Sequence, residues 1–422
     1  MRRNNAFIHE KPGWPELSWN GESLSAALAT VRHKQGRLLG RMEALGFDLR
    51  TEASLAVLTS DVVKSSAIEG EKLNPEEVRS SIARRLGLDI AGLPKASRDV
   101  EGVVEMMLDA TRNFASPLTR ERLFDWHAAL FPTGRSGLGR MTVGAWRTRE
   151  TGPMQVVSGA YGHERVHFEA PDAGRLGSEM ARFLAWFNAP ASIDPVLKAG
   201  VAHFRFVTIH PFEDGNGRIA RAIADLALAR ADGTKDRFYS MSSRIEAERK
   251  DYYRELESAQ RGDVDITRWL AWFLGCLDRA LDGADQTLAA VLFKARLWQR
   301  INLHPVNDRQ RLVINRLLSR AEGEFPTPGS QPGPAYRERA QRASRTVATG
   351  SGPTGETGTT QDRLDGFQGF LSTSKYAKLA KCSTDTALRD ILELLKRGIL
   401  VQNPGRGRST SYRLAGPEDI AD

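Results

Sequence analysis

The sequence predicts a mainly α-helical protein with an N-terminal helical domain, a helical core that carries one small β-hairpin, and a C-terminal winged helix-turn-helix. Three observations predict this class. Apolar residues recur at helical spacing over most of the 422 residues. Between residues 97 and 285, strand-like sequence is limited to a glycine-containing run at about 155–168. The end of the chain has the pattern of two helices and two short strands, which is typical of a winged helix.

The composition excludes several classes of protein. Apolar residues make up 41% and charged residues 27%, which are ordinary values for a soluble globular chain. The first residues lack the apolar segment of a secretory signal, and no window approaches the roughly 18 apolar residues of a membrane span. Cys276 and Cys382 are the only cysteines and lack metal-ligand spacing. We therefore expect a cytoplasmic protein with no membrane partner.

The basic residues are unevenly distributed. The chain has a formal net charge of +8, but residues 371–413 alone contain nine basic and three acidic residues. This imbalance predicts a locally basic module at the C-terminus rather than a generally basic surface.

Changes in composition and periodicity divide the chain. The expected N-terminal part is a helical domain at 1–95, with helices within 14–46 and at about 52–70, and it is followed by a helical core at 96–285. The expected C-terminal parts are linker helices with the first winged-helix helix at 286–320, a Gly/Pro-rich disordered insertion at 321–363, a winged helix-turn-helix at 364–415, and a tail at 416–422.

Two helices are expected in the winged helix-turn-helix, over residues 373–382 and 383–396, with Ser383 as the N-cap of the second. Leu388, Ile391, Leu392 and Leu395 are expected to line the packed face of that second helix. Strands at about 399–401 and 406–414 complete the pattern.

The residues that carry chemistry gather between two helical stretches. They are His210, Phe212, Asp214, Gly215, Asn216, Gly217, Arg218 and Arg221. Free N–H groups at the start of a helix bind phosphate, and glycines let the backbone approach an anion closely. The two arginines would add charge and forked donors.

Asp214 and His210 complete the predicted chemistry. A carboxylate such as Asp214 suits Mg²⁺ that still carries substrate phosphates, and His210 could accept a proton at neutral pH. The residues alone therefore predict magnesium-dependent phosphate transfer, and leave open which phosphate is attacked. The alternative is a glycine-rich turn with a core histidine and two surface arginines.

This arrangement resembles the signature of Fic proteins, His-x-Phe-x-Asp/Glu-Gly-Asn-Gly-Arg-x-x-Arg, at every specified position. The resemblance implies a helical core that transfers AMP from ATP to a Ser, Thr or Tyr hydroxyl of a protein, with release of pyrophosphate. It implies His210 as the base, Asp214 as the Mg²⁺ ligand, the backbone of residues 215–217 as the anion hole, and Arg218 and Arg221 on the β and γ phosphates.

Gly215 bears on the choice of reaction. Branches of the family with Ala at this position include a kinase, whereas Gly-Asn-Gly is similar to the adenylylating branch. Phosphocholine transfer also occurs in the family and stays an alternative.

Two further segments agree with the resemblance. Residues 154–168, with Val157, look like the flap hairpin over the active site, whose edge can pair with an extended target. In related Fic proteins the adenine is bordered by residues that correspond to Tyr252, Tyr253 and Gln260. The resemblance implies the same role here, although related proteins have Asn at the position of Gln260. The alternatives are an ordinary surface hairpin and core aromatic residues.

Residues 65–70 resemble the family's inhibitory helix, Ser/Thr-x-x-x-Glu-Gly/Asn, with Ser65 first and Glu69 as its acid. The resemblance implies that Glu69 pairs with Arg221 and keeps ATP in an unproductive pose. The alternative is that Gly70 merely ends a helix. The position of the motif ahead of the core is typical of a bacterial branch of the family.

The sequence thus favours an autoinhibited protein adenylyltransferase that uses ATP and Mg²⁺ and modifies target proteins, including itself. Removal of AMP is compatible with the same chain, as is a homodimer. The alternative is a DNA-binding regulator, in which Thr384, Thr386 and Arg389 enter the major groove while Arg406 and Arg408 contact phosphates. Winged helices also serve as protein-interaction modules.

Overall fold

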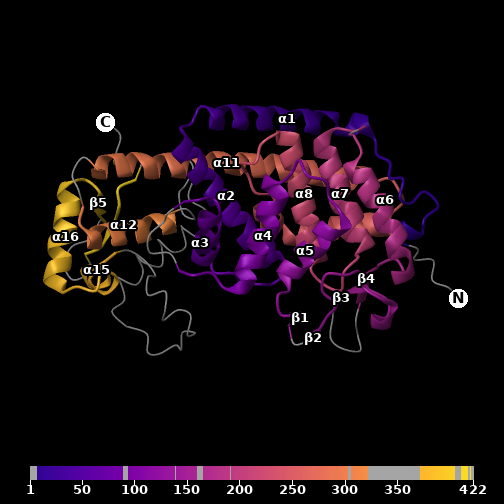
Figure 1. Ribbon diagram of the computed structural model, residues 1–422. Helices are drawn as coiled ribbons and strands as arrows, with labels where there is room; N and C mark the ends of the chain where they lie inside the picture. Colours follow the sequence, from indigo (N-terminus) through magenta and orange to yellow (C-terminus); the bar gives the residue numbers. More distant parts are fainter. Residues whose placement is uncertain are drawn as a thin grey trace, which may run out of the picture. The chain divides into compact units, whose positions relative to one another are not determined.

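The computed structural model describes residues 7–88, 94–137, 139–158, 165–190, 192–302, 306–321, 371–403, 410–416 and 419. The chain divides into two compact units, residues 1–285 and 286–422 (Figure 1). The mainly α-helical class predicted from the sequence is confirmed. The expected insertion lies outside the described residues from residue 322 onward, as do Arg406 and Arg408. Among the described helices, none combines the length and apolarity that crossing a bilayer requires.

The first unit contains most of the helices. They are α1 (Gly21–Glu43), α2 (Phe47–Ile68), α3 (Pro75–Arg85), α4 (Arg98–Arg112), α5 (Arg120–Leu130), α6 (Leu176–Asn188), α7 (Pro195–Ile209), α8 (Asn216–Asp232), α9 (Met241–Ala247), α10 (Arg249–Arg261) and the first part of α11 (Thr267–Asn302), with short 3₁₀ turns at Ile8–Glu10, Arg149–Thr151 and Ala173–Arg175. The helix expected at residue 52 begins earlier, at Phe47.

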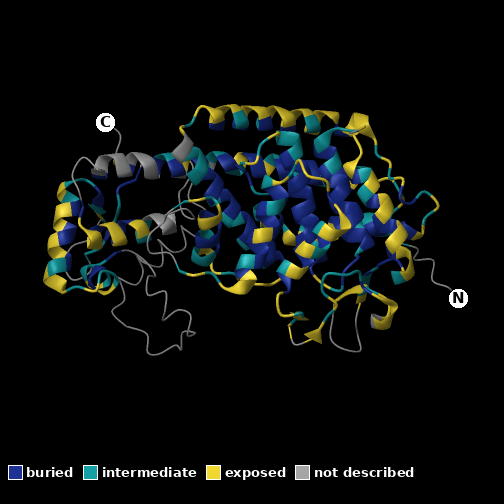
Figure 2. Cartoon of the chain, in the orientation of Figure 1, coloured by how far each residue is buried: buried dark blue, intermediate teal, exposed yellow. Residues whose placement is uncertain are grey.

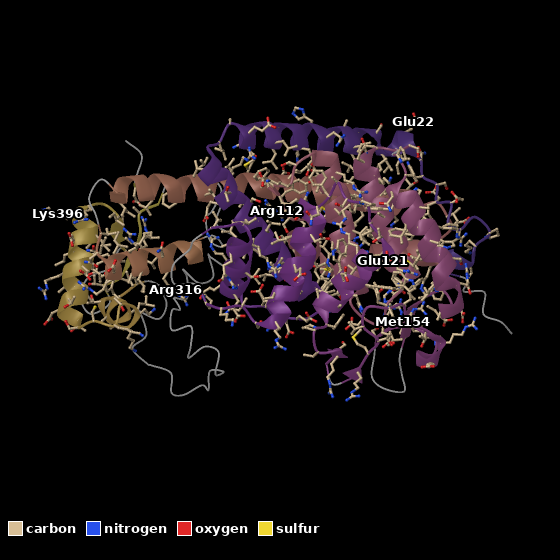
Figure 3. The ribbon with its side chains drawn as sticks, viewed as in Figure 1. Glu22, Arg112, Glu121, Met154, Arg316 and Lys396 are labelled. Carbon is tan, nitrogen blue, oxygen red and sulfur yellow. The ribbon has the colours of Figure 1, made fainter. Side chains whose placement is uncertain are left out.

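Two small antiparallel hairpins interrupt these helices. The first pairs β1 (Arg135–Ser136) with β2 (Gly139–Arg140), and the second pairs β3 (Gln155–Ser158) with β4 (Arg165–Glu169). The β3–β4 ladder contains an irregularity between Val156 and Val157. Met154, which Figure 3 labels, precedes β3, and its carbonyl accepts a hydrogen bond from the N–H of Ala170. This hairpin lies where the flap is expected.

The core of the first unit is the antiparallel pair α7 and α8. Asp194 caps the start of α7 with its carboxylate, and Pro195 occupies the first helical position, where no N–H is needed. Nearly every residue of both helices is buried, as their dark blue colour in Figure 2 shows. Surrounding helices bury these two from all sides, and the loop that joins them, residues 210–215, is held at one end of the pair.

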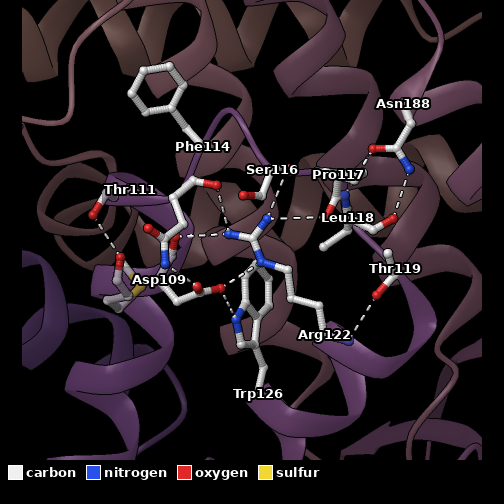
Figure 4. A network of polar contacts seen from close by, with 12 residues as sticks. Asp109, Thr111, Phe114, Ser116, Pro117, Leu118, Thr119, Arg122, Trp126 and Asn188 are labelled. Carbon is white, nitrogen blue, oxygen red and sulfur yellow. Dashed lines mark hydrogen bonds and ion pairs between the residues drawn. The ribbon is translucent and has the colours of Figure 1, made fainter.

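A charged network joins α4 and α5 to the loop between them. The guanidinium of Arg122 donates to the carboxylate and the carbonyl of Asp109, and also to the carbonyls of Asn113 and Ser116 (Figure 4). Trp126 donates its indole N–H to the same carboxylate at 2.7 Å. The cation therefore ties the last turn of α4 and the loop after it to the first turn of α5.

The second unit packs α12 (Asp308–Ala321), α15 (Thr373–Leu379) and α16 (Thr384–Lys396) with the antiparallel strands β5 (Leu400–Gln402) and β6 (Tyr412–Leu414) and with the last part of α11. Among the described residues of this unit, the buried carboxylate is that of Asp390. Arg309, Asn307 and the hydroxyl of Tyr376 all donate to it. Ser383 caps α16 through the N–H of Thr386.

The expected packed face of α16 is wrong in part. Ile391 is fully buried, but Leu388 and Leu392 are 41% and 54% exposed. The buried positions are instead Ala387, Ile391 and Leu394, at helical spacing on a neighbouring stripe. Because leucines lie on both stripes, the periodicity of the sequence does not tell which stripe is buried. Ala387 lies on the buried stripe, where its small side chain packs closely.

We expect Gly102→Ala to destabilise the full-length chain by about 1–3 kcal/mol. A Cβ atom at this position of α4 would lie 1.7 Å from the carbonyl oxygen of Ala129 in α5, so the two helices would have to separate. Chemical unfolding followed by circular dichroism measures the change. Gly36→Ala is the control, because this exposed position of α1 has no atom within 4 Å, and it should stabilise by about 0.5–1 kcal/mol. Equal changes in unfolding free energy for the two variants would contradict the close approach of α4 and α5 at Gly102.

Candidate active site

His210 ends α7 in the left-handed region, with φ of 52°. The residue is of intermediate burial, and the Nδ1 of its ring lies 3.1 Å from the carbonyl of Val207. A carbonyl only accepts, so Nδ1 carries the proton and donates, which leaves Nε2 free to accept one. Arg147 fixes the backbone, since its Nε donates to the carbonyl of His210 at 2.8 Å and its guanidinium also donates to the carbonyl of Pro171, just beyond β4.

The protonation state of His210 follows from its surroundings. Burial lowers its pKa to about 4, the hydrogen bond to Val207 and the carboxylates of Glu69 and Asp214 oppose this, and the charge of Arg147 adds to it. The imidazole is therefore neutral at pH 7. A neutral ring with a free Nε2 can act as a general base.

Aromatic packing holds the loop in one shape. Phe212 is fully buried, and its ring stacks on His127 with centroids 4.1 Å apart. His127 Nδ1 accepts from the N–H of Gly144, so its Nε2 donates to the carbonyl of Asp214. The side chain of Asn216 accepts from the N–H of Phe212 and donates to its carbonyl. The side chain of Asn216 is thus engaged within the loop.

The start of α8 provides donors for an anion. Gly215 adopts φ of 80°, which glycine favours, and the N–H groups of the first helical turn have no partner inside the helix. Arg218 follows on this turn with its side chain 3% exposed, and its Nε is buried without a hydrogen-bond partner among the described residues. Unpaired buried donors at a helix start fit the phosphates of a nucleotide.

The structure brings Glu69, Ser65 and Arg221 together. Arg221 is 2% exposed, and its Nη1 lies 2.8 Å from Glu69 Oε1 as an ion pair, although the N–H does not point along the contact. The directed hydrogen bonds of the guanidinium go to the hydroxyl and the carbonyl of Ser65. Burial alone would lower the pKa of Arg221, but the charge and hydrogen bonding of Glu69 together with the nearby Tyr252 and Tyr253 outweigh it, so the pKa is raised.

Glu71 is a residue of the site that the sequence reasoning missed. Its Oε2 accepts from Nη1 of Arg218 at 2.6 Å, while the same guanidinium lies 5.0 Å from the ring centroid of Phe131. Burial raises the pKa of Glu71, the charge of Arg218 opposes this, and the charges of Asp214 and Glu69 add to it, so the pKa is raised. Both arginines that face the anion site are thus paired with carboxylates from the end of α2. The second acid in Glu69-Gly70-Glu71 was the available signal.

Asp214 is the carboxylate that could hold a metal ion. Its Oδ1 accepts from the N–H of Gly215 at 2.6 Å and its Oδ2 from the hydroxyl of Ser136 at 2.5 Å. One carboxylate beside an anion site fits Mg²⁺, which keeps waters and substrate phosphates as its other ligands. No group of three His, Cys, Asp or Glu residues with the geometry to hold a metal ion occurs in the described parts of the chain.

The residues expected to border the nucleobase, and Val157 of the flap, differ in how far they are buried. Tyr252 is buried and its hydroxyl bonds to Nε2 of His203, while Gln260 is buried with its amide on Thr208, so both pack in the core. Tyr253 is 38% exposed, and its hydroxyl donates to the carbonyl of Ile68, next to Glu69. Val157 is 48% exposed on β3. Tyr253 and Val157 remain open to a ligand, whereas Tyr252 and Gln260 do not.

We expect His203 to make the stability of the first unit pH-dependent. Burial and the charge of Arg221 lower its pKa from 6.5 to about 3, against a hydrogen bond to Ala220. The unfolded chain therefore binds more protons below pH 6.5, so stability is full above that pH and is lost as the pH falls toward 3. The loss from this group should be about 2 kcal/mol between about pH 7.5 and pH 5.

His203→Gln should remove that share of the pH dependence, because Gln can still bond to Tyr252 but does not titrate. Thermal unfolding across this pH range measures the slope of stability against pH. The comparison uses this slope alone, so a change in the absolute stability of the variant does not affect it. Parallel curves of stability against pH for the variant and the unchanged protein would contradict the assignment of this pH dependence to His203.

Comparison with known proteins gives the site its context. Residues 117–228 match the Fic/DOC family, and residues 7–88 match a domain of unknown function, DUF4172. Over 115 residues the chain is 37% identical to a protein adenylyltransferase Fic of Culex quinquefasciatus and 36% identical to that of Drosophila virilis. These segments are 26% of this chain and 21% and 22% of the relatives, so the match spans about a fifth of their length.

Solved structures of Fic proteins also resemble the chain at low sequence identity. A Fic family protein of Desulfovibrio desulfuricans aligns over 92% of this chain and 96% of its own, with 21% identity and a TM-score of 0.45. Fic-1 of C. elegans aligns over 65% and 75%, with 21% identity and a TM-score of 0.43.

Proposed function

Since the chain carries a Fic/DOC domain over residues 117–228, we propose that it is an autoinhibited protein adenylyltransferase. It transfers AMP from ATP to a Ser, Thr or Tyr hydroxyl of a protein. One observation carries the proposal: a neutral His210 with a free Nε2 sits on the same short loop as an anion-binding helix start with two buried arginines. Relatives named protein adenylyltransferase, which match a quarter of the chain, support the choice of group transferred.

The reaction uses these residues in separate roles. His210 Nε2 accepts the proton of the acceptor hydroxyl, whose oxygen bonds to the α-phosphorus of ATP. The bond from that phosphorus to the oxygen bridging to the β-phosphate breaks, and pyrophosphate leaves. The first turn of α8 holds phosphate oxygens with its N–H groups, while Arg218 and Arg221 hold the β and γ phosphates. Asp214 is the residue that would hold Mg²⁺, which when bound neutralises part of the phosphate charge.

The two glutamates at the end of α2 support autoinhibition. Glu69 and Glu71 lie within 2.8 Å of the two guanidinium groups on which a triphosphate depends. A Cβ built at Gly217 would lie 2.2 Å from Glu69 Oε1, so this carboxylate already fills the space against the bare backbone. ATP cannot engage both arginines while these pairs persist, and its α-phosphate is then misaligned. An intact Glu69 also supports removal of AMP from targets as a second activity.

The remaining parts of the chain receive proposed roles. We assign residues 1–95 to a regulatory domain and 96–285 to the catalytic core, because both glutamates precede residue 95. Residues 286–320 with 364–415 are proposed as a winged helix-turn-helix. Its α16 exposes Leu388 and Leu392 beside Arg389, and an apolar face does not favour the DNA-binding alternative. The free thiols of Cys276 and Cys382 support a cytoplasmic location.

Glu69→Gly should strongly increase incorporation of label from α-labelled ATP with Mg²⁺ into the protein itself. The change frees Arg221 for the γ-phosphate and aligns the α-phosphate, and each 1.4 kcal/mol or so recovered in the transition state is about tenfold in rate. Label from γ-labelled ATP should not appear, because the γ-phosphate leaves with pyrophosphate. Autoradiography of the purified full-length chain measures both.

A double variant separates this account from simple weakening of α2. Adding Arg221→Ala to Glu69→Gly should remove the gain, since the released cation is then missing. Transfer of label from the γ position would mean a kinase. Unchanged labelling by folded Glu69→Gly at saturating ATP would refute autoinhibition.

Glu71→Gln should act on nucleotide binding more than on the chemical step. It breaks a pair of 2.6 Å and leaves Arg218 free for the β-phosphate, which binds equally in the ground and transition states. In the Glu69→Gly background, KM for ATP should fall about fivefold with kcat nearly constant. This is the change expected when Glu71 no longer competes with the β-phosphate for Arg218, at roughly 1 kcal/mol. Steady-state kinetics over a range of ATP concentrations measures the split. Glu76→Gln, on α3, is the control for charge loss and should leave KM unchanged.

A further inference from the structure

The flap hairpin and α10 bring together a serine, a histidine and a glutamate that the proposed reaction does not use. The hydroxyl of Ser158 at the end of β3 lies 2.5 Å from Nε2 of His167 on β4. Nδ1 of the same ring lies 2.7 Å from Oε2 of Glu257 on α10. A nucleophile within hydrogen-bond reach of a base, which a third group orients, is the arrangement of an activated serine.

The hydrogen-bond roles in this group can be assigned. A carboxylate only accepts, so Nδ1 of His167 donates to Glu257. In the tautomer with its proton on Nδ1, Nε2 accepts from the hydroxyl of Ser158. Burial raises the pKa of Glu257, but hydrogen bonds from His167 and Arg165 outweigh this, so the pKa is lowered and the group is a carboxylate at neutral pH. The ring is thereby held in the tautomer that can take the proton of Ser158.

A cation stands next to the nucleophile. Arg165 is the cross-strand partner of Ser158 in the β3–β4 ladder, and its side chain is 69% exposed. One of its N–H groups donates to Glu257 Oε1 at 2.9 Å. A guanidinium has five N–H donors, so it can also meet negative charge that develops on an electrophile held by Ser158. A phosphoryl-type group, which carries such charge on its oxygens, suits this cation better than a neutral ester.

The hairpin is fixed on two sides, so the group has a stable frame. Arg261 of α10 donates to the carbonyl of Val166 at 2.6 Å, next to His167. Arg147 joins the segment after β4 to the carbonyl of His210. Ser158 itself is exposed and therefore open to a reactant.

From this geometry we propose that Ser158 is a second nucleophilic site, which takes up phosphoryl-type groups with His167 as its base. The Ser158 oxygen forms a bond to the phosphorus, the bond from phosphorus to the leaving group breaks, and the Ser158 proton passes to Nε2 of His167. Glu257 is a positioning residue, because it acts through the imidazole. The step needs neither ATP nor His210, so it stands apart from the proposed adenylyl transfer.

A fluorophosphonate probe tests the proposal on the full-length chain, because its reaction releases fluoride and leaves a phosphonyl group on an activated serine. Peptide mass spectrometry should find the label on Ser158, at a rate at least about 10²-fold above that of Ser178. Ser178 is the matched comparison, since its hydroxyl is exposed but bonds only to the carbonyl of Arg175. Ser158→Ala should lose the label, and Ser178→Ala should keep it.

Two conservative variants separate activation from exposure. His167→Gln should lower labelling of Ser158 to about the Ser178 rate and abolish an ionisation in the pH–rate profile, and Glu257→Gln should lower the rate about tenfold. Circular dichroism establishes that each variant is folded. Equal labelling of Ser158 and Ser178, or full labelling with an unchanged pH profile in folded His167→Gln, would overturn the proposal. If His167→Gln is unfolded, Glu257→Gln is tested in its place, and full labelling of Ser158 with an unchanged pH profile in this variant would overturn the proposal.

Discussion

The neutralisation of one buried cation organises the region around the loop. Arg221 is 2% exposed, and an unpaired guanidinium so deeply buried would cost several kcal/mol. Glu69 and the end of α2 provide its counter-charge and its directed acceptors, so α2 must lie against α8 for the core to be stable. In the proposed active state a γ-phosphate provides the same negative charge. In that proposed state the cation exchanges one negatively charged partner for another.

The rest of the loop is built to stay still while that exchange takes place. Phe212 is stacked on His127, and Asn216 closes the loop on itself through both its amide and its carbonyl oxygen. Arg147 fixes the backbone of His210 from the opposite side. Close packing and satisfied polar groups of this kind leave few alternative arrangements. On the α2 side, by contrast, Gly70 adopts a positive φ and the side chain of Glu71 is half exposed.

Features encoded within a few neighbouring residues could be predicted from the sequence, and features made by distant segments could not. The loop from His210 to Arg221 carries its chemistry in one stretch, and the pair of Glu69 and Arg221 was reached through a short motif. Glu71 was missed because the second acid after Gly70 was the only signal for it, and the sequence does not show that the turn at Gly70 directs this side chain to Arg218. Ser158 and Glu257 come from elements about a hundred residues apart, and no spacing rule relates them. On α16, two leucine stripes fitted one periodicity, and only packing chose between them.

If Glu69 inhibits the site as proposed, its attachment to the same chain has a consequence for control. A competitor held on the last turn of α2 is present at a fixed effective concentration, which depends on the geometry of the tether and not on how much protein a cell makes. Dilution cannot remove it, and raising the protein level cannot strengthen it. The threshold of nucleotide needed for a productive pose is therefore an intrinsic constant of each molecule. Only an event that moves the end of α2, such as binding of a partner to the N-terminal helices, could reset that threshold.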